Sequence, residues 1–111
     1  MMTFDVKDLG NGSVVIALKG KLNMVSAPRL REAIVSAVTD GNTRIAVDLK
    51  DLEFIDSSGL GALINGLKTT RQAGGDLRIA APNEQVKLVL QLTNIDRVLT
   101  AYDHAELAFQ Q

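Results

Sequence analysis

The sequence predicts an α/β fold: one domain with a mixed sheet of four to five strands and about four helices packed against it. Aliphatic strand-like segments alternate with segments of helical periodicity, a pattern typical of parallel strands joined by helices. A glycine-rich turn near the N-terminus joins two extended segments and adds antiparallel pairing. The length of 111 residues fits a single domain over residues 1–111, with no linker or internal repeat.

The first elements are a hairpin and a helix. Residues 6–20 contain two extended segments around the turn at 10–12, which predicts a β-hairpin. Ser26 can cap the following helix, with Pro28 in its first turn, and Gly41 ends it. The apolar face of this helix repeats at helical spacing and comprises Leu30, Ala33, Ile34, Ala37 and Val38.

Strands and helices alternate through the rest of the chain. Residues 44–49 form a strand with small Ala46 on one face and, on the other, Ile45, Val47 and Leu49. A loop at 51–56 leads to a second helix that starts near Ser57 and ends at the glycine pair 74–75. A strand follows at 77–81. We expect the core to include Ile34, Val47, Leu49, Leu60, Leu63, Ile64, Leu67, Ile79 and Val89.

The C-terminal part adds a third helix and a short strand. Asn83 is a suitable cap for this helix. Its apolar face comprises Val86, Val89, Leu90, Thr93 and, at its margin, Leu92. A last strand is expected at 98–102, and Asp103 with Glu106 resembles a capping box for a terminal helical turn.

Composition excludes several classes of function. The absence of cysteine excludes disulfides, thiol catalysis and thiolate zinc clusters. Twelve basic and thirteen acidic residues give a net charge of −1 without a basic cluster, which argues against nucleic acid as a partner. No apolar run approaches the ~18 residues of a membrane span. The first eight residues lack a cationic region followed by an apolar stretch, so we do not expect them to act as a secretory signal. We therefore expect a cytoplasmic protein without membrane insertion.

Catalysis is not expected. The single histidine, His104, lies near the C-terminus, and neither a nucleophile-elbow nor a phosphate-loop motif is present. The Gly-x-Gly-x-x-Gly motif of dinucleotide-binding proteins is incomplete, because Ile64 occupies its third glycine position. Asp5, Asp8 and Asp56 could suggest a phospho-acceptor receiver domain. However, the chain is shorter than such a domain by one strand–helix unit. The sequence thus predicts no catalytic residues, no metal site and no cofactor.

The uncharged segment 57–67 requires an explanation, because it places three glycines in a helix. Each mid-helix glycine costs about 1 kcal/mol relative to alanine. A strip of small residues results, comprising Gly59, Ala62, Gly66, Thr70 and Ala73. Such a strip suits close packing of a neighbouring helix or docking of another protein, and both interpretations remain open.

Two serines precede this helix, and either could cap it. The same position favours a phosphate, because free N–H groups and the helix dipole point toward it. The acidic residues Asp48, Asp51, Glu53 and Asp56 are close in sequence. They could repel a phosphate, help hold Mg²⁺ for a kinase's nucleotide, or be solvated loop charges.

Residues 56–61, Asp-Ser-Ser-Gly-Leu-Gly, resemble the signature of bacterial anti-sigma factor antagonists, the stand-alone STAS-domain proteins. Residues 20–23 resemble the Gly-x-Leu-Asp element of that family, and Ala27-Pro28 follows as it does there. The strand at 44–49 and the glycine pair before the strand at 77–81 extend the similarity over nearly the whole chain.

The resemblance implies a binding protein regulated by phosphorylation. Unphosphorylated, such a protein binds an anti-sigma factor and releases a sigma factor; the anti-sigma factor is often a serine kinase, and a metal-dependent serine phosphatase reverses the modification. By resemblance Ser57 is the phospho-acceptor, with Ser58 as the alternative. Asn23 replaces the family's usual Asp, which could alter phosphorylation. The implied partner-binding residues are Asn23, Asp56, Ser57, Ser58, Gly59, Leu60, Gly61, Ala62 and Gly66.

Two hypotheses follow. The leading one is an anti-sigma factor antagonist that serine phosphorylation inactivates. The alternative is a STAS scaffold or regulatory module of a stress-signalling or transport assembly, in which the serines serve only the helix terminus. A weaker third hypothesis is nucleotide binding by the domain itself. In each case a monomer is expected.

Overall fold

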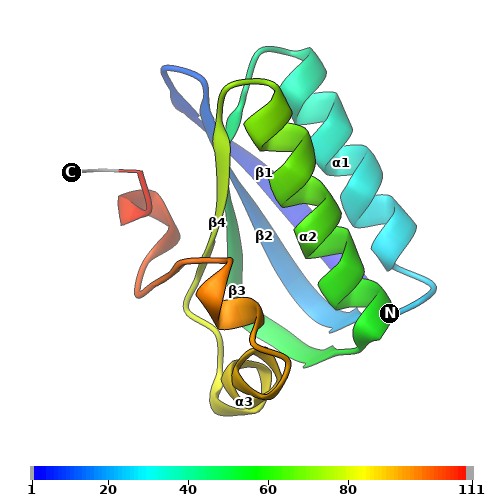
Figure 1. Cartoon of the computed structure of the whole chain (residues 1–111). Coiled ribbons are helices and arrows are strands. Elements are labelled where there is room, and N and C mark those ends of the chain that lie inside the picture. Colours follow the sequence, from blue (N-terminus) through cyan, green and yellow to red (C-terminus); the bar gives the residue numbers. More distant parts are fainter. Residues whose placement is uncertain (1, 110–111) are drawn as a thin grey trace.

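The computed structural model describes residues 2–109 and has the predicted α/β fold (Figure 1). The sheet has five strands, as predicted, together with three α-helices and two short 3-10 helices. In chain order these elements are β1 (Met2–Gly10), β2 (Ser13–Leu22), α1 (Ala27–Thr39), β3 (Arg44–Ile55), α2 (Ser57–Gln72), β4 (Asp76–Ala80), α3 (Glu84–Leu92), η1 (Ile95–Arg97), β5 (Ala101–Tyr102) and η2 (Ala105–Leu107).

The strands lie in the sheet in the same order as in the chain, β1-β2-β3-β4-β5. β1 and β2 form the predicted antiparallel hairpin, and each later strand is parallel to its neighbours. Asn11 and Gly12 form the hairpin turn with φ of 56° and 79°, values that Asn and Gly tolerate better than other residues. The mixed sheet expected from the sequence is therefore confirmed.

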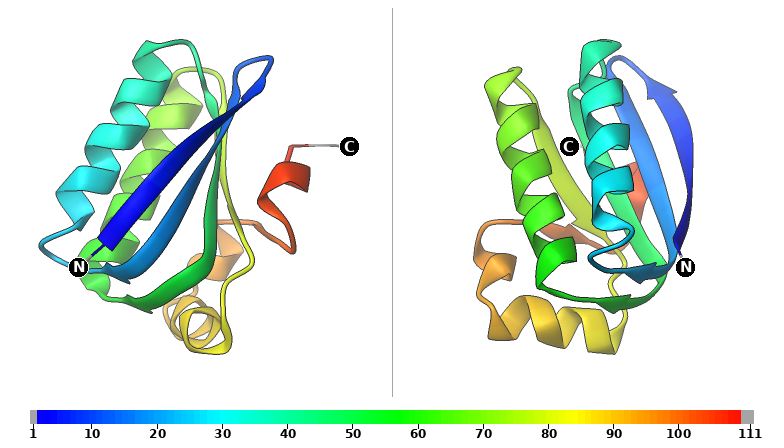
Figure 2. Two further views of the ribbon diagram at one scale, coloured as in Figure 1. Left: turned by 180° about the vertical axis from the view of Figure 1, so that it is seen from behind. Right: turned by 90° about the vertical axis from the view of Figure 1, so that its right-hand side faces the viewer.

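The two faces of the sheet are covered unequally. Helices α1 and α2 lie side by side on one face, and α3 packs at the end of the sheet where β3 finishes (Figures 1 and 2). The core under the helices contains the large aliphatic residues, among them Ile16, Leu30, Leu63 and Ile79. The opposite face is covered by the C-terminal segment and has a smaller core of Val15, Ala46, Ala80, Ala105 and Ala108.

The predicted core is largely confirmed. Ile45, Val47 and Leu49 face the helices whereas Ala46 faces the opposite side, as the alternation in β3 requires. Ile64 and Val89 are only partly buried at the margin of the core. Leu92 is 73% exposed, so its assignment to the apolar face of α3 was wrong.

Several boundaries differ from the prediction. The last strand, expected at 98–102, comprises only Ala101–Tyr102. Residues 51–55 belong to β3 rather than to a loop, because they pair with residues 19–22 of β2 past a register shift. This extension brings the end of β3 to Ile55, directly before α2. At the C-terminus the capping box of Asp103 and Glu106 is absent; His104 precedes η2 and makes no side-chain capping bond.

Candidate functional site

The N-terminus of α2 is fixed by Asp56. Pairing of β2 with β3 continues to Ile55, and the Asp56 N–H donates a hydrogen bond to the Leu22 carbonyl (3.2 Å). Asp56 is therefore held in extended conformation, and its Oδ1 accepts a hydrogen bond from the Gly59 N–H (2.9 Å). This is N-cap geometry, with a carboxylate at the positive end of the helix dipole. The interpretation of the serines as caps was wrong.

With Asp56 as the cap, Ser57 and Ser58 occupy the first two helical positions. Ser57 is exposed, whereas Ser58 is half-buried. The backbone N–H groups of the first helical positions have no acceptor within the helix. Ser57 thus presents a hydroxyl to solvent beside backbone donors that can bind an anion.

Four of the five residues in the small-residue strip face inward, whereas Ala73, at the C-cap of α2, is exposed. Gly59 and Gly66 are buried, and Ala62 and Thr70 are 0% exposed. A Cβ on Gly59 would lie 2.7 Å from the Leu22 carbonyl oxygen, and one on Gly66 would lie 2.6 Å from Cδ1 of Ile34 in α1. The strip therefore packs against β2 and α1. Placing Gly59, Ala62 and Gly66 on a docking surface was wrong, and Leu60, 7% exposed, also belongs to the core.

Gly61 is different from these glycines. It is partly exposed, and the nearest atom to a Cβ at this position would be Nη2 of Arg31, 3.7 Å away. Ser57 and Gly61 are four residues apart on one helix and so share a face. The first turn of α2 accordingly offers an open surface on which Ser57 and Gly61 lie together, beside the guanidinium of Arg31.

Asn23 lies next to this surface and has a structural role. Its Oδ1 accepts hydrogen bonds from the N–H groups of Val25 (3.0 Å) and Ser26 (3.2 Å), while the Asn23 N–H donates to Ser26 Oγ (2.9 Å). This reciprocal pair closes the turn before α1. Ser26 occupies the N-cap position, as predicted, but its side chain makes no capping hydrogen bond to the helix. Because the side chain acts through an acceptor oxygen, an Asp would serve equally here.

Exposed apolar side chains adjoin this region, and they were not predicted from the sequence. Met24 is 73% exposed and Val25 is 80% exposed, in a loop that directly follows Leu22 and therefore adjoins the start of α2. Phe54, 46% exposed, lies on the last part of β3. Their apolar character was visible in the sequence, but only the fold shows that these side chains do not enter the core.

The neighbouring acidic residues do not form a metal site. Asp48 is buried, and its Oδ1 accepts a hydrogen bond from the Lys50 N–H (3.1 Å). Asp51 and Glu53 are exposed. Within residues 2–109 no group of three or more His, Cys, Asp or Glu side chains could hold a metal ion. None of the helices in this part of the chain has the length and apolarity needed to cross a membrane.

The sequence matches the model of the STAS domain family over residues 5–108. The chain belongs to the STAS domain family. A Thermotoga maritima protein assigned as an anti-sigma factor antagonist is 36% identical over 100 residues, which cover 88% of each chain. The anti-sigma-B factor antagonist of Bacillus subtilis is 28% identical over 86% of this chain and 85% of its own length. These relatives carry the names of regulatory proteins rather than of enzymes.

Solved structures agree with this membership. The crystal structure of an anti-sigma factor antagonist from Mycobacterium paratuberculosis superimposes with a TM-score of 0.81 and 28% identity, covering 94% of this chain and 87% of that one. Unphosphorylated SpoIIAA, an anti-sigma factor antagonist, superimposes with a TM-score of 0.78 at 24% identity and covers 89% of this chain and 87% of its own. The latter likeness concerns the fold alone.

Proposed function

We propose that this STAS protein is an anti-sigma factor antagonist controlled by phosphorylation of Ser57. In this proposal the unphosphorylated protein binds an anti-sigma factor in the cytoplasm and releases the sigma factor that it held. The anti-sigma factor acts as the serine kinase, and a metal-dependent serine phosphatase restores the active form. The main support is the exposed Ser57 hydroxyl at the first position of α2, directly after a residue that already caps the helix.

The proposed binding surface is mostly uncharged. It comprises the open first turn of α2, with Ser57, part of Ser58 and Gly61, and the apolar loop residues Met24 and Val25. Asn23 supports the surface by closing the turn before α1, and Asp56 supports it by capping α2. Apolar side chains that lose contact with water contribute about 25 cal/mol per Å², which favours a partner with a complementary apolar patch.

A phosphate on Ser57 would oppose binding through its charge. It adds between one and two negative charges to this surface, next to the Asp56 carboxylate. The free N–H groups of Ser57 and Ser58 can donate hydrogen bonds to the phosphate oxygens, so the fold tolerates the modification. In the complex, however, the same charge would be removed from water without a partner, at a cost of several kcal/mol. The proposed switch is thus electrostatic and steric, with little change in the backbone.

The test combines phosphorylation and binding with the anti-sigma factor kinase of the same genome. After incubation with kinase and ATP, wild type and Ser58→Ala should each gain about 80 Da, the mass of one phosphate, whereas Ser57→Ala should not. Ser57→Ala should bind the anti-sigma factor in the presence of ATP, and Ser57→Asp should fold but bind weakly. Because Ser58 is half-buried and Asp56 is the cap, neither alanine variant should lose more than a few tenths of a kcal/mol of stability.

Other results would revise the proposal. If Ser57→Ala still gains one phosphate and Ser58→Ala does not, the acceptor is Ser58. If neither serine is modified although the kinase binds wild type, the chain is a constitutive scaffold. If an anti-sigma factor neither binds nor modifies the chain, the proposed function is wrong.

A further inference from the structure

Strand β1 lies at one edge of the sheet, and the short strand β5 lies at the other edge. Strand β1 is nine residues long, and among residues 2–109 its only partner strand is β2. Residues 5–8 of β1 are all exposed, including Val6 at 53%. An edge strand of this length carries unpaired backbone N–H and C=O groups that can pair with another strand.

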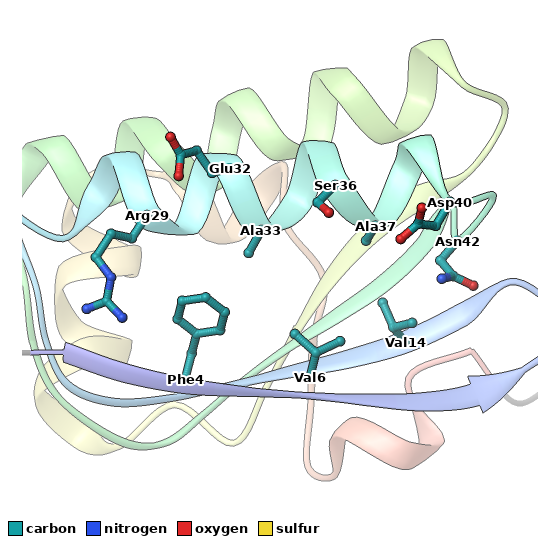
Figure 3. Close-up of a pocket in the computed structure, with 10 residues that line it drawn as sticks. All are labelled: Phe4, Val6, Val14, Arg29, Glu32, Ala33, Ser36, Ala37, Asp40 and Asn42. Atoms are coloured by element: carbon teal, nitrogen blue, oxygen red, sulfur yellow. The ribbon is translucent and has the colours of Figure 1, made fainter.

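A groove of about 440 Å³ runs between this edge and helix α1 (Figure 3). Phe4 and Val6 of β1 and Ala33 of α1 form its apolar floor and wall. The charges along it are unevenly distributed. Arg29 lies at the Phe4 end, with its guanidinium 5.4 Å from the centre of the Phe4 ring. Glu32 follows it along α1, and Asp40 lies at the opposite end.

We propose that a second copy of this chain binds here, with the two β1 strands antiparallel and Val6 of one opposite Val6 of the other. In this register Asp5 of each copy lies opposite Lys7 of its partner copy, which gives two pairs of opposite charge across the strands. Shifting the register by two residues would place Asp5 opposite Asp5 or Lys7 opposite Lys7. The charges therefore select one alignment.

The groove independently favours the same alignment. Along β1, Phe4, Val6 and Asp8 point toward the helix face, where Phe4 joins the core and Val6 lines the groove. A two-fold axis through Val6 brings the Phe4 end of one copy to the Asp8 end of the other. Arg29 of each groove, which shares this end of α1 with Glu32, then meets the acidic end of its partner, which carries Asp8 and Asp40. Val6 of the second copy would cover the exposed apolar mouth of the groove.

The contacts that these side chains make within one copy leave the pairing possible. Lys7 lies 3.9 Å from Glu106, but both side chains are more than half exposed, so the ion pair is weak. Arg29 donates one hydrogen bond to the Met2 carbonyl, and its guanidinium has further donors. The charges on β1 thus oppose pairing with most strands while matching a second copy in one register.

The test is sedimentation equilibrium of the full chain from micromolar to millimolar concentration. Wild type should form a weak dimer. Asp5→Lys and Lys7→Asp should each raise the dimer dissociation constant by about tenfold, since each creates two like-charge pairs. The double variant, with both substitutions, should restore wild-type affinity. Lys68→Asp on the exposed side of α2 is the control, because it changes net charge as Lys7→Asp does but lies outside the groove.

A second measurement locates the interface. Alternate backbone amides of residues 3–8 should exchange hydrogen more slowly as protein concentration rises, in wild type and in the double variant. A chain that remains monomeric at millimolar concentration would overturn the proposal and support the monomer expected from the sequence. A dimer that is insensitive to the single substitutions, or that the double variant does not restore, would overturn the β1 alignment. Neither result bears on Ser57.

Discussion

Glycines on the two sides of helix α2 have opposite surroundings: those on the inner side are closely packed, and the one on the outer side is open. On the inner side, Gly59 and Gly66 leave no room for a Cβ, because β2, β4 and α1 approach within 3 Å of its position. On the outer side, Gly61 faces only the end of Arg31 at 3.7 Å. The inner glycines are therefore needed for packing, whereas the outer one is open to a partner. A glycine-rich helix in this fold combines these two roles within three turns.

The largest expected effect concerns the inner side. Leu63 is 0% exposed, so Leu63→Ala should leave a cavity and lower the free energy of unfolding by about 2–5 kcal/mol. Chemical denaturation with an unchanged m-value would measure it. A loss below about 1 kcal/mol would mean that the inner side is not closely packed, and the comparison would fail.

Gly59→Ala should be nearly as harmful, by about 3 kcal/mol, the upper end of the usual cost of overpacking. The new methyl group would meet the Leu22 carbonyl oxygen and Cγ of Leu22, which cannot move without disturbing β2. Thermal unfolding compared with Gly61→Ala, the same change on the outer side, would detect the difference. Equal melting temperatures would contradict it.

Gly66→Ala should cost less, about 1 kcal/mol net. Its methyl group would meet Cδ1 of Ile34 and of Leu77, the flexible ends of two side chains, and the gain in helix propensity offsets part of the strain. The free energy of unfolding of Gly66→Ala, measured by denaturation, should therefore lie between those of Gly59→Ala and wild type. Binding of the anti-sigma factor by the folded variant should be unchanged, and a selective loss of binding would return Gly66 to the interface.

The smallest effect on stability should have the opposite sign. Gly61→Ala adds a methyl group in open space within a helix and should stabilise the domain by up to about 1 kcal/mol. If a partner approaches the first turn of α2, the same methyl group should weaken binding. A titration of wild type and variant against the anti-sigma factor would sharpen the comparison, and a more stable variant with undiminished binding would place the interface elsewhere.

Hydrophobic periodicity predicted most of the fold but not the direction in which small residues face. The stripe of Leu60, Leu63 and Leu67 identified the inner side of α2 because large aliphatic side chains have one favourable environment. Glycine and alanine pack equally well under a helix or under a partner, so their spacing left two interpretations open. The close approach of Leu22 from β2 and of Ile34 from α1 decides between them.

The cap of α2 was missed for a related reason. Asp, Ser and Ser follow one another at residues 56–58, and each type is a good capping residue. The choice depends on where β3 ends, and β3 extends to Ile55 only because β2 continues to pair with it. The pairing of β2 with β3 thus determined which residue caps α2. Likewise, Asn23 was interpreted through its resemblance to an acidic family position, whereas its hydrogen bonds close the turn that precedes α1.

The order of the strands has a consequence for how the chain folds. Since each strand lies beside the one that precedes it in sequence, the sheet can grow from one side as the chain is synthesised. The β1–β2 hairpin needs only a two-residue turn, whereas β3 can join only after α1 has formed the crossover. Pulse-labelled hydrogen exchange should therefore protect amides of the hairpin before those of β4, and the reverse order would exclude growth from the N-terminal edge.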